Sequence, residues 1–474
     1  MLKYIFKRLL IFIPTLIVIS FLAFGLSKMT PGDPVYAMLG ETSEISSAGG
    51  YAHSQQVYEE TAEMLGLHKP VFYVTLSSSA FPDTLHRILQ RDHRKNLVKL
   101  IQQYGNWPQI DHYYQALQDF QASFYEVDLG VPSNELTKVG VNLRRLFTVY
   151  EPKVIQSRLD TIEQNIQQER VLLAELGPGF KTVKDAFQDI LRKPTRWKLY
   201  LPDIKWNGWD NQYHNWFAGF VRGDFGISYK DKRPVSDSIW EALQKTLLLN
   251  VLALFFTYLL SIPLGVFSAI YRDSLFDRTT TLILFILYSL PSFWIGTMLV
   301  VFLTTPEYGM NWFPSSGLPH LPSDASFIQR FWAMATHLTL PVFCLTYGSL
   351  AFLSRQIRSS MLNVLQEDFV RTAYAKGLRP QRVIWKHAFR NALFPLITLF
   401  ATIFPSLLAG SVVIEVIFNI FGMGKLTVDA IFDKNWPIVY TVLMLSAIMT
   451  MLGILVADLL YAWADPRVTY GKKR

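Results

Sequence analysis

Long apolar segments are the feature that most limits what this chain can fold into. Each is close to the roughly 20 residues that an α-helix needs to cross a bilayer. They occupy residues 9–26, 246–271, 280–304, 337–353, 393–416 and 437–463. Half of the 474 residues are hydrophobic, which is too large a share for an ordinary soluble protein of this size. We therefore predict an all-α polytopic membrane protein with six transmembrane helices.

Basic residues are distributed unevenly around these segments, and this predicts their orientation. One group of segments is rich in basic residues: the two chain ends, the connection between the second and third spans, and the connection between the fourth and fifth. These segments contain Lys3, Lys7, Arg8, Arg272, Arg278, Arg355, Arg358, Arg371, Lys376, Arg379, Arg382, Lys386, Arg390, Arg467, Lys472, Lys473 and Arg474. The short opposite connections contain only Arg330, Lys425 and Lys434. Because short cytoplasmic loops are rich in Lys and Arg, we expect both termini in the cytoplasm. The net charge of +8 then reflects membrane flanks, and we expect no nucleic-acid partner.

The chain divides into four regions on this basis. Residues 1–28 are predicted to form an N-terminal transmembrane helix that is retained, because its apolar run is long for a cleaved signal peptide. Residues 29–240 lack a spanning segment and form an extracytoplasmic region. Residues 241–465 contain the other five spans, and residues 466–474 are a cytoplasmic tail.

The polar region shows apolar residues at three- and four-residue steps, which predicts amphipathic helices. One such pattern runs from Pro152 towards Gly177. Turn signals at Gly177–Gly179 and a capping box of Thr182 with Asp185 predict that another helix begins there. These helices together could bury a modest core.

The segment Gln366–Pro395 is polar, basic and helical in propensity, although it lies between two apolar segments. Gly377 followed by Pro380 predicts a short helix, a turn and a second short helix that returns to the membrane. We expect the loop to be cytoplasmic, and docking to a soluble partner would explain why it is structured.

Ionisable and polar residues within the apolar segments are candidates for a gate or pathway. Glu415 and Asp458 lie near segment ends, where a charge faces a bundle interior or pairs with a nearby base or backbone donor. Asn250, Pro291 and Ser292 complete this set, and Pro291 should kink the third span. Polar residues of this kind also simply hold helices together, so both roles stay open.

The sequence offers no pattern for a catalytic or metal site. The nearest match to a phosphate-binding loop is Gly422–Thr427, but Leu426 follows the lysine and Asn419 replaces the first glycine. The single cysteine, Cys344, excludes an intrachain disulfide and a cysteine metal cluster. We expect neither an enzyme nor a bound cofactor or metal.

Many short motifs in order resemble the first permease subunit of bacterial dipeptide/oligopeptide ABC importers, which have the type I importer fold. They are MTPGDP (29–34), MLGLHKP (64–70), FVRGDFGISY (220–229), RPV (233–235), NVLALFF (250–256), IPLGV (262–266), PSFW (291–294), LTLP (338–341), EDFVRTAYAKGL (367–378), HAFRNALFP (387–395), FGMGKLTVDAI (421–431) and ADPRVTYG (464–471). The combination is specific, whereas no single piece is.

The resemblance implies that residues 354–392 form the loop that couples the permease to its ATPase. Its EAA motif places Arg371, Thr372 and Ala373 at the E-A-A positions and Gly377 at the motif glycine. Arg371 and Arg390 depart from the general pattern, which removes the role of the motif's glutamate but not docking. The expected docking residues are Glu367, Asp368, Arg371, Thr372, Ala373, Lys376, Gly377, Arg382, His387 and Arg390.

The resemblance also implies the setting. The chain would be a multi-pass permease of the bacterial cytoplasmic (inner) membrane, moving peptides by alternating access with a second permease subunit, an extracytoplasmic substrate-binding protein and two ATPase subunits. These ATPases would use ATP and Mg. Nickel, glutathione and oligosaccharide importers use similar permeases, so other cargo stays open. A membrane-anchored receptor or scaffold is the alternative from another class.

One departure from the family is large. Residues of about 73–210 stand where relatives have a short connection, and they contain the predicted amphipathic helices. We expect a helical extracytoplasmic insert. It either contacts the binding protein or substrate, or serves only packing and stability.

Overall fold

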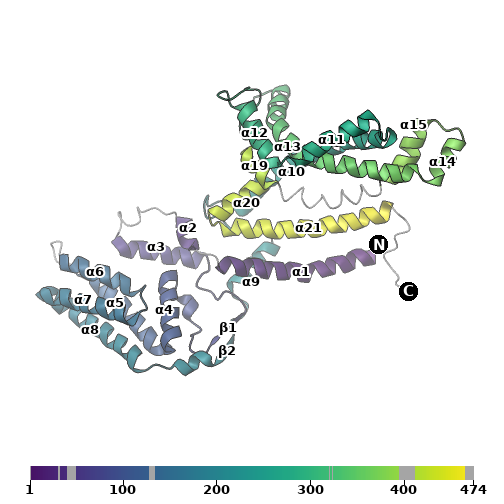
Figure 1. Cartoon of the computed structure of the whole chain (residues 1–474). Coiled ribbons are helices and arrows are strands. Elements are labelled where there is room, and N and C mark those ends of the chain that lie inside the picture. Colours follow the sequence, from purple (N-terminus) through teal and green to yellow (C-terminus); the bar gives the residue numbers. More distant parts are fainter. Residues whose placement is uncertain are drawn as a thin grey trace. The chain divides into compact units, whose positions relative to one another are not determined.

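The computed structural model describes residues 2–29, 32–39, 50–127, 134–319, 321–322, 324–393 and 411–464 (Figure 1). They belong to two compact units. One comprises Met1–Thr30 and Gly223–Arg474, and the other comprises Pro31–Arg222. The first unit contains the apolar helices and the second contains most of the polar region.

Among the described residues of the first unit, four helices are long and apolar enough to cross a membrane. They are α1 (Leu2–Met29), α10 (Val235–Ile270), α13 (Phe327–Leu365) and α21 (Trp436–Ala464). A fifth span results if α11 (Leu275–Ser289) and α12 (Ser292–Thr304) count as one. The predicted span 393–416 lies mostly outside the described residues, so its existence stays a prediction.

The third predicted span is broken rather than kinked. Helix α11 ends at Ser289, α12 begins at Ser292, and the two are bent by 90°. Pro291 has no N–H with which to continue α11, and the carbonyl of Leu290 instead accepts a hydrogen bond of 2.8 Å from the Tyr347 hydroxyl of α13. The bend predicted at Pro291 is therefore confirmed as a complete break in the helix, and the span itself stays a prediction.

Helices α10 and α13 form the main packing contact of this unit. A Cβ atom at Gly265 of α10 would lie 2.6 Å from the Cβ of Ile357 and 2.7 Å from the carbonyl oxygen of Ser354. Glycine therefore allows the two helices to approach closely at this level. With 39 residues, α13 is about 58 Å long, nearly twice the thickness of the hydrocarbon core.

The remaining helices of the first unit are short. They are α14 (Asp368–Ala375), α15 (Pro380–Arg382), the π-helical turn η4 (Val383–Ala388), α16 (Phe389–Ala392), α19 (Val412–Ile417) and α20 (Met423–Phe432). Helices α1 and α21 lie side by side, as Figure 1 shows.

The second unit is a helical bundle with one small sheet. Its elements are α2 (Pro34–Leu39), α3 (Gly50–Met64), β1 (Val74–Ser78), η2 (Leu85–Arg87), α4 (Arg91–Tyr104), α5 (Trp107–Glu126), α6 (Asn134–Leu146), α7 (Pro152–Gln168), α8 (Arg170–Arg192), η3 (Arg196–Tyr200), β2 (Pro202–Trp206) and α9 (Gln212–Val221). Helices α4 to α8 bury one continuous apolar core, which confirms that the amphipathic helices share a core.

Helix α8 runs through the predicted turn at Gly177–Gly179. Its apolar side chains Leu172, Leu176 and Phe180 are buried and continue in register to Phe187. Thr182 donates to the carbonyl of Pro178 instead of capping a helix start, so the predicted capping box was wrong. Core burial over this stripe outweighs the local preference of Gly and Pro for a turn.

Strands β1 and β2 were not expected in an all-α chain. They pair antiparallel, with Val74 opposite Trp206 and Ser78 opposite Pro202. The pairing joins the two ends of the helical bundle, since α4 to α8 lie between the strands in the sequence. A salt bridge of 2.6 Å between Lys69 and Asp210 also joins the chain just before β1 to the chain just after β2.

We expect the second unit to lose stability in acid because of His93. This buried imidazole stacks on Phe147 with ring centroids 4.4 Å apart and contacts the Tyr114 hydroxyl at 3.2 Å. Burial lowers the pKa of His93 from 6.5 to about 4, although Asp92 partly opposes the shift. The unfolded chain therefore binds the proton first. The stabilising difference is present above pH 6.5 and is lost as the pH falls towards 4, by about 3 kcal/mol.

The measurement is the urea dependence of proteolysis within α4 to α6 of the full chain in detergent, at pH 7 and pH 4. Because phenylalanine can stack on Phe147 without titrating, the variant H93F should lose less stability than the wild type in acid. An equal acid-induced loss in both proteins would contradict the assignment to His93.

Candidate functional site

Helix α14 ends in a glycine cap that defines the predicted turn. Gly377 has φ +75°, its N–H donates to the Tyr374 carbonyl at 2.9 Å, and the Leu378 N–H donates to the Ala373 carbonyl at 3.3 Å. These two bonds form a Schellman motif, which places a left-handed residue at the position of Gly377. The short helix and turn predicted here are confirmed.

The chain then returns towards α13 through a second helical piece. Pro380 begins α15 at a position where its missing N–H costs nothing. The turn η4 that follows is π-helical, a rare form that occurs often at functional sites. It contains His387, whose carbonyl accepts from Asn391 at 2.9 Å. We call residues 366–393 the docking segment.

One side of the docking segment is buried in an apolar cluster with residues of the long helices. Val370 and Ala373 of α14 are buried, with 1% and 7% of their surface exposed. They share an apolar cluster with Val266 of α10, and Ile357 and Met361 of α13. Within this cluster α14 packs on η4, and η4 and α16 pack on α13, so the second helical piece joins α14 to the long helix α13.

The other side of the segment is exposed and basic. Among the predicted docking residues, Ala373 is buried and His387 half-buried, whereas the exposed ones are Glu367, Asp368, Arg371, Thr372, Lys376, Gly377, Arg382 and Arg390. Arg371 lies 3.6 Å from Asp368, an exposed pair that contributes little stability. These side chains are available to a partner.

Sequence reasoning missed the aromatic members of this surface. Phe369 and Tyr374 are 42% and 44% exposed on α14, and Trp385 is 40% exposed on η4. Aromatic and arginine side chains are enriched in protein interfaces. The helical pattern could have revealed two of them. Phe369 and Tyr374 are the immediate neighbours of the buried residues Val370 and Ala373, and adjacent residues of a helix point in different directions.

Sequence reasoning also missed a buried ion pair beside the docking segment. Asp277, in the first turn of α11, is 3% exposed. Arg358 of α13 donates from Nε to Oδ1 and from Nη2 to Oδ2, each at 2.7 Å. The backbone N–H of Asp273 donates to Oδ2 at 3.0 Å. This two-bond pair fixes the start of α11 to the part of α13 that leads into α14.

Glu415 is enclosed by hydrogen-bond donors. It is 1% exposed, and its Oε1 accepts from the Thr246 hydroxyl of α10 at 2.9 Å. Its Oε2 accepts from the Lys425 N–H at 3.0 Å, in the first turn of α20. The Thr246 hydroxyl oxygen also accepts from the Met423 N–H at 2.7 Å. The carboxylate thus joins α10, α19 and α20.

Asp458 on α21 pairs with the beginning of the chain. The Tyr4 hydroxyl donates to its Oδ2 at 2.5 Å, and the Arg8 guanidinium lies 3.0 Å from the same oxygen. Both partners belong to α1, so the carboxylate links the first and last described helices of this unit. The pairing with a nearby base corresponds to the second role considered for this residue.

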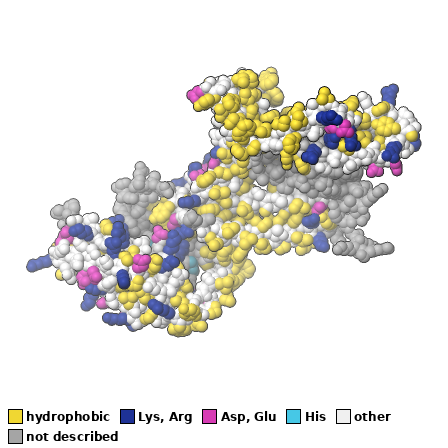
Figure 2. All heavy atoms as spheres, in the orientation of Figure 1, with side chains coloured by type: hydrophobic (Ala, Val, Ile, Leu, Met, Phe, Trp, Pro, Cys, Tyr) yellow, Lys and Arg dark blue, Asp and Glu magenta, His cyan; other side chains and the backbone are white. Residues whose placement is uncertain are grey.

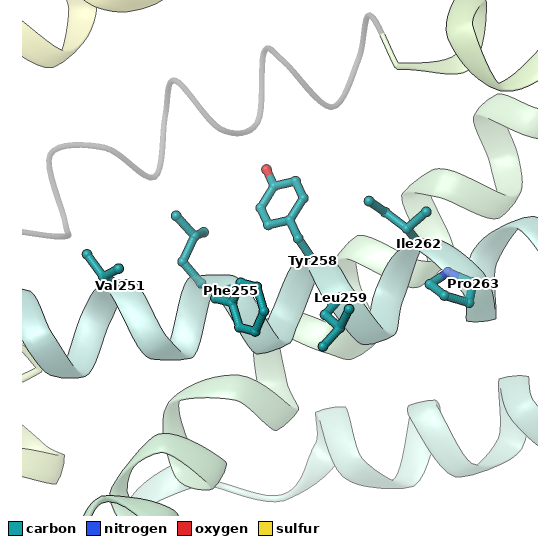
Figure 3. A pocket seen from close by; sticks show the side chains of 7 residues that line it. Val251, Phe255, Tyr258, Leu259, Ile262 and Pro263 are labelled. Atoms are coloured by element: carbon teal, nitrogen blue, oxygen red, sulfur yellow. The ribbon is translucent and has the colours of Figure 1, made fainter. Parts of the chain in front are cut away.

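The remaining candidates for a gate or pathway lie apart from Glu415 and Asp458. Asn250 is half-buried on α10, and Pro291 and Ser292 are exposed at the break between α11 and α12. A pocket of about 560 Å³ lies along α10, lined by Val251, Leu254, Phe255, Tyr258, Leu259, Ile262 and Pro263 (Figure 3). The structure does not gather the candidates into one site, and their gate or pathway role stays a prediction.

Comparison with known proteins gives these features a context. Residues 261–470 match the family described as binding-protein-dependent transport system inner membrane component. The chain is 41% identical over 260 residues to the oligopeptide transport system permease protein AppB of Bacillus subtilis, covering 55% of this chain and 80% of that protein. It is 37% identical over 279 residues to the dipeptide transport system permease protein DppB of Escherichia coli, covering 55% and 81%.

A solved structure of the MetNI methionine ABC transporter, in inward-facing conformations, is a more distant match. It is 18% identical with a TM-score of 0.38, covering 48% of this chain and 96% of that chain. The identity to the two peptide permeases, extending over about four fifths of each, decides the assignment. The chain is a multi-pass membrane protein that belongs to the family of permease subunits of bacterial peptide ABC importers.

Proposed function

We propose that this chain is one permease subunit of an ATP-driven importer that carries peptides across the bacterial inner membrane. Its partners would be a second permease subunit, two ATPase subunits and an extracytoplasmic substrate-binding protein. Both termini and the docking segment would face the cytoplasm, in agreement with the basic loops. The membrane core would comprise six spans in the type I importer arrangement.

The observation that carries this proposal is the two-sided construction of α14. One side, with Val370 and Ala373, is buried in the apolar cluster that also contains residues of α10, α13 and η4, and the other side presents exposed charged and aromatic residues. An ATPase cleft that grips the exposed side would move α14 as a rigid piece. The buried side would pass that motion to the long helices.

Alternating access follows from this coupling. Two ATPases closing on ATP and Mg would bring the two docking segments together, and the permeases would rock from inward-facing to outward-facing. A peptide from the binding protein would enter, and hydrolysis would restore the first state. The docked contact must favour different permease states in the two ATPase states, because a contact equal in both would shift nothing.

Peptide cargo is favoured by the similarity to peptide permeases. Nickel, glutathione or an oligosaccharide stays an alternative for the same machine, because the docking segment carries no information on cargo. Competition for uptake of a labelled peptide by each of these compounds, in cells that lack and regain this gene, distinguishes them.

Replacing Gly377 with valine should reduce peptide uptake by roughly tenfold or more. Space is not the limit, because nothing lies within 4 Å of a Cβ atom at this position. The cause is the φ of +75°, which a β-branched residue adopts only with strain of about 1–3 kcal/mol. The cap of α14 would open and misplace the docking surface. Uptake of labelled peptide and ATPase activity of the reconstituted importer are the measurements.

The matched control is G377N, because asparagine tolerates the left-handed conformation. It should retain most of the uptake. Both variants should insert in the membrane in normal amounts, as shown by quantifying the chain in membranes. Normal uptake by G377V would refute the role proposed for the docking segment.

A further inference from the structure

The two-stranded sheet exposes its apolar side. Val74 is opposite Trp206, and Leu76 is opposite Ile204, so these four side chains share one face. They are 43%, 63%, 78% and 71% exposed, in that order. An antiparallel sheet on a water-facing surface normally shows the reverse arrangement.

The opposite face of the sheet is polar, and its lysine is paired within the protein. Lys205 donates to the Phe81 carbonyl at 2.7 Å and pairs with Asp83 at 2.5 Å and Asp203 at 3.3 Å. Thr75 accepts a bond of 2.7 Å from the Asn207 amide. The charge of Lys205 is therefore neutralised within the protein, and the exposure of the apolar side does not depend on another molecule that pairs with this lysine.

Exposed aromatic side chains also stand next to the strands in the sequence. Trp209 packs edge-on against Trp206 with ring centroids 6.1 Å apart and is 66% exposed. Trp197 and Tyr200 of η3, directly before β2, are 61% and 85% exposed. The Lys198 ammonium lies 5.9 Å from the Trp197 ring. Hydrophobic side chains gather around β1 and β2 in Figure 2, whereas charged ones are frequent over the helices of the same unit.

This combination of residues fits the headgroup region of a bilayer. Tryptophan and tyrosine concentrate at membrane interfaces, where one end of the ring system is in an apolar medium and the other is hydrated. A lysine beside them can reach lipid phosphates while its stem stays among apolar groups. We name Val74, Leu76, Trp197, Tyr200, Ile204, Trp206 and Trp209 the aromatic face.

We propose that the aromatic face lies in the outer-leaflet headgroup region of the membrane that the chain itself spans. The proposal rests on the extracytoplasmic placement given above. Along the chain, the face lies between spans α1 and α10, with β2 ending 29 residues before α10 begins. A membrane is therefore always within reach. A soluble partner that binds transiently would leave this large apolar surface in water for part of every cycle.

The test uses two neighbouring positions of β1 that point to opposite faces. Leu76→Cys and Thr75→Cys are made in the full chain with Cys344→Ala, and each is labelled with an environment-sensitive fluorophore. The chain is reconstituted in phosphatidylcholine and phosphatidylglycerol vesicles that contain a headgroup-proximal nitroxide lipid. Asp160→Cys, exposed on α7, is the distant control. All three positions are exposed, so the labels should not prevent folding.

We expect the label at position 76 to lose most of its emission to the nitroxide lipid and to be shielded from aqueous iodide. The labels at positions 75 and 160 should keep their emission in the nitroxide lipid and be quenched by iodide. Equal behaviour of 76 and 160 would overturn the proposal. Shielding of position 76 that occurs only after a soluble extracytoplasmic protein is added would overturn it in favour of protein docking.

The orientation is tested separately. A membrane-impermeant maleimide should label position 160 in intact spheroplasts. Labelling only after permeabilisation would overturn the extracytoplasmic placement, and with it the outer-leaflet assignment. Failure of lipid quenching with normal labelling of position 160 would overturn the lipid contact alone and leave the transport function unaffected.

Discussion

Replacing Arg358 with methionine should destabilise the membrane unit by about 3 kcal/mol and abolish most uptake. Methionine keeps much of the length of the side chain but leaves Asp277 as a buried carboxylate that has lost two bonds of 2.7 Å. Because the pair joins α11 to the part of α13 next to the docking segment, both stability and coupling should suffer. Thermal denaturation in detergent, followed by size-exclusion chromatography, measures the first, and peptide uptake measures the second.

The double variant R358M/D277N distinguishes the cost of a buried unpaired charge from the loss of coupling between the helices. The neutral pair removes the unpaired charge, so most of the lost stability should return. Uptake should stay low if the ion pair also positions α13. Recovery of both properties would show that the pair serves stability alone. A single variant R358M with wild-type stability would contradict the burial argument.

Replacing Gly265 with leucine should separate α10 from α13 and prevent a stable chain. The first added atom would already lie 2.7 Å from the Ser354 carbonyl oxygen, which is backbone and cannot rotate away. Overpacking of this kind costs about 1–3 kcal/mol or more, and here the strain falls on the largest helix contact of the unit. The amount of monodisperse protein extracted from membranes measures the effect.

Gly348 offers a matched control within α13. It is also a helical glycine of a spanning segment, but nothing lies within 4 Å of a Cβ atom there. G348L should therefore be extracted in nearly normal amount. If G265L and G348L behave alike, the loss reflects the general effect of leucine in these helices and not the close approach.

Local sequence signals predicted α14 and its cap because the decisive residues are adjacent in the chain. Gly377 and Pro380 determine the turn through their own backbone preferences, and the flanking helical pattern does the rest. The apolar helices α1, α10, α13 and α21 were visible for the same reason, since hydropathy is summed over one continuous segment.

Features that depend on distant partners could not be predicted in this way. Asp277 and Arg358 are 81 residues apart, so their pairing appears only when α11 and α13 are packed. The outward face of β1 and β2 depends on a strand pair whose members are separated by the whole of α4 to α8. Helix α8 crosses Pro178 because the core of the bundle, not local propensity, decides its course.

The pairing of β1 with β2 makes the intervening bundle a modular cassette. Residues 79–201 connect Ser78 to Pro202, and these two residues lie directly opposite each other in the sheet. A segment whose ends already meet can be exchanged without altering the span of chain on either side. In evolutionary terms, such a cassette can be acquired in a single event, and its sequence can then diverge independently of the transport machinery. The same site would accept a reporter domain with closely spaced termini.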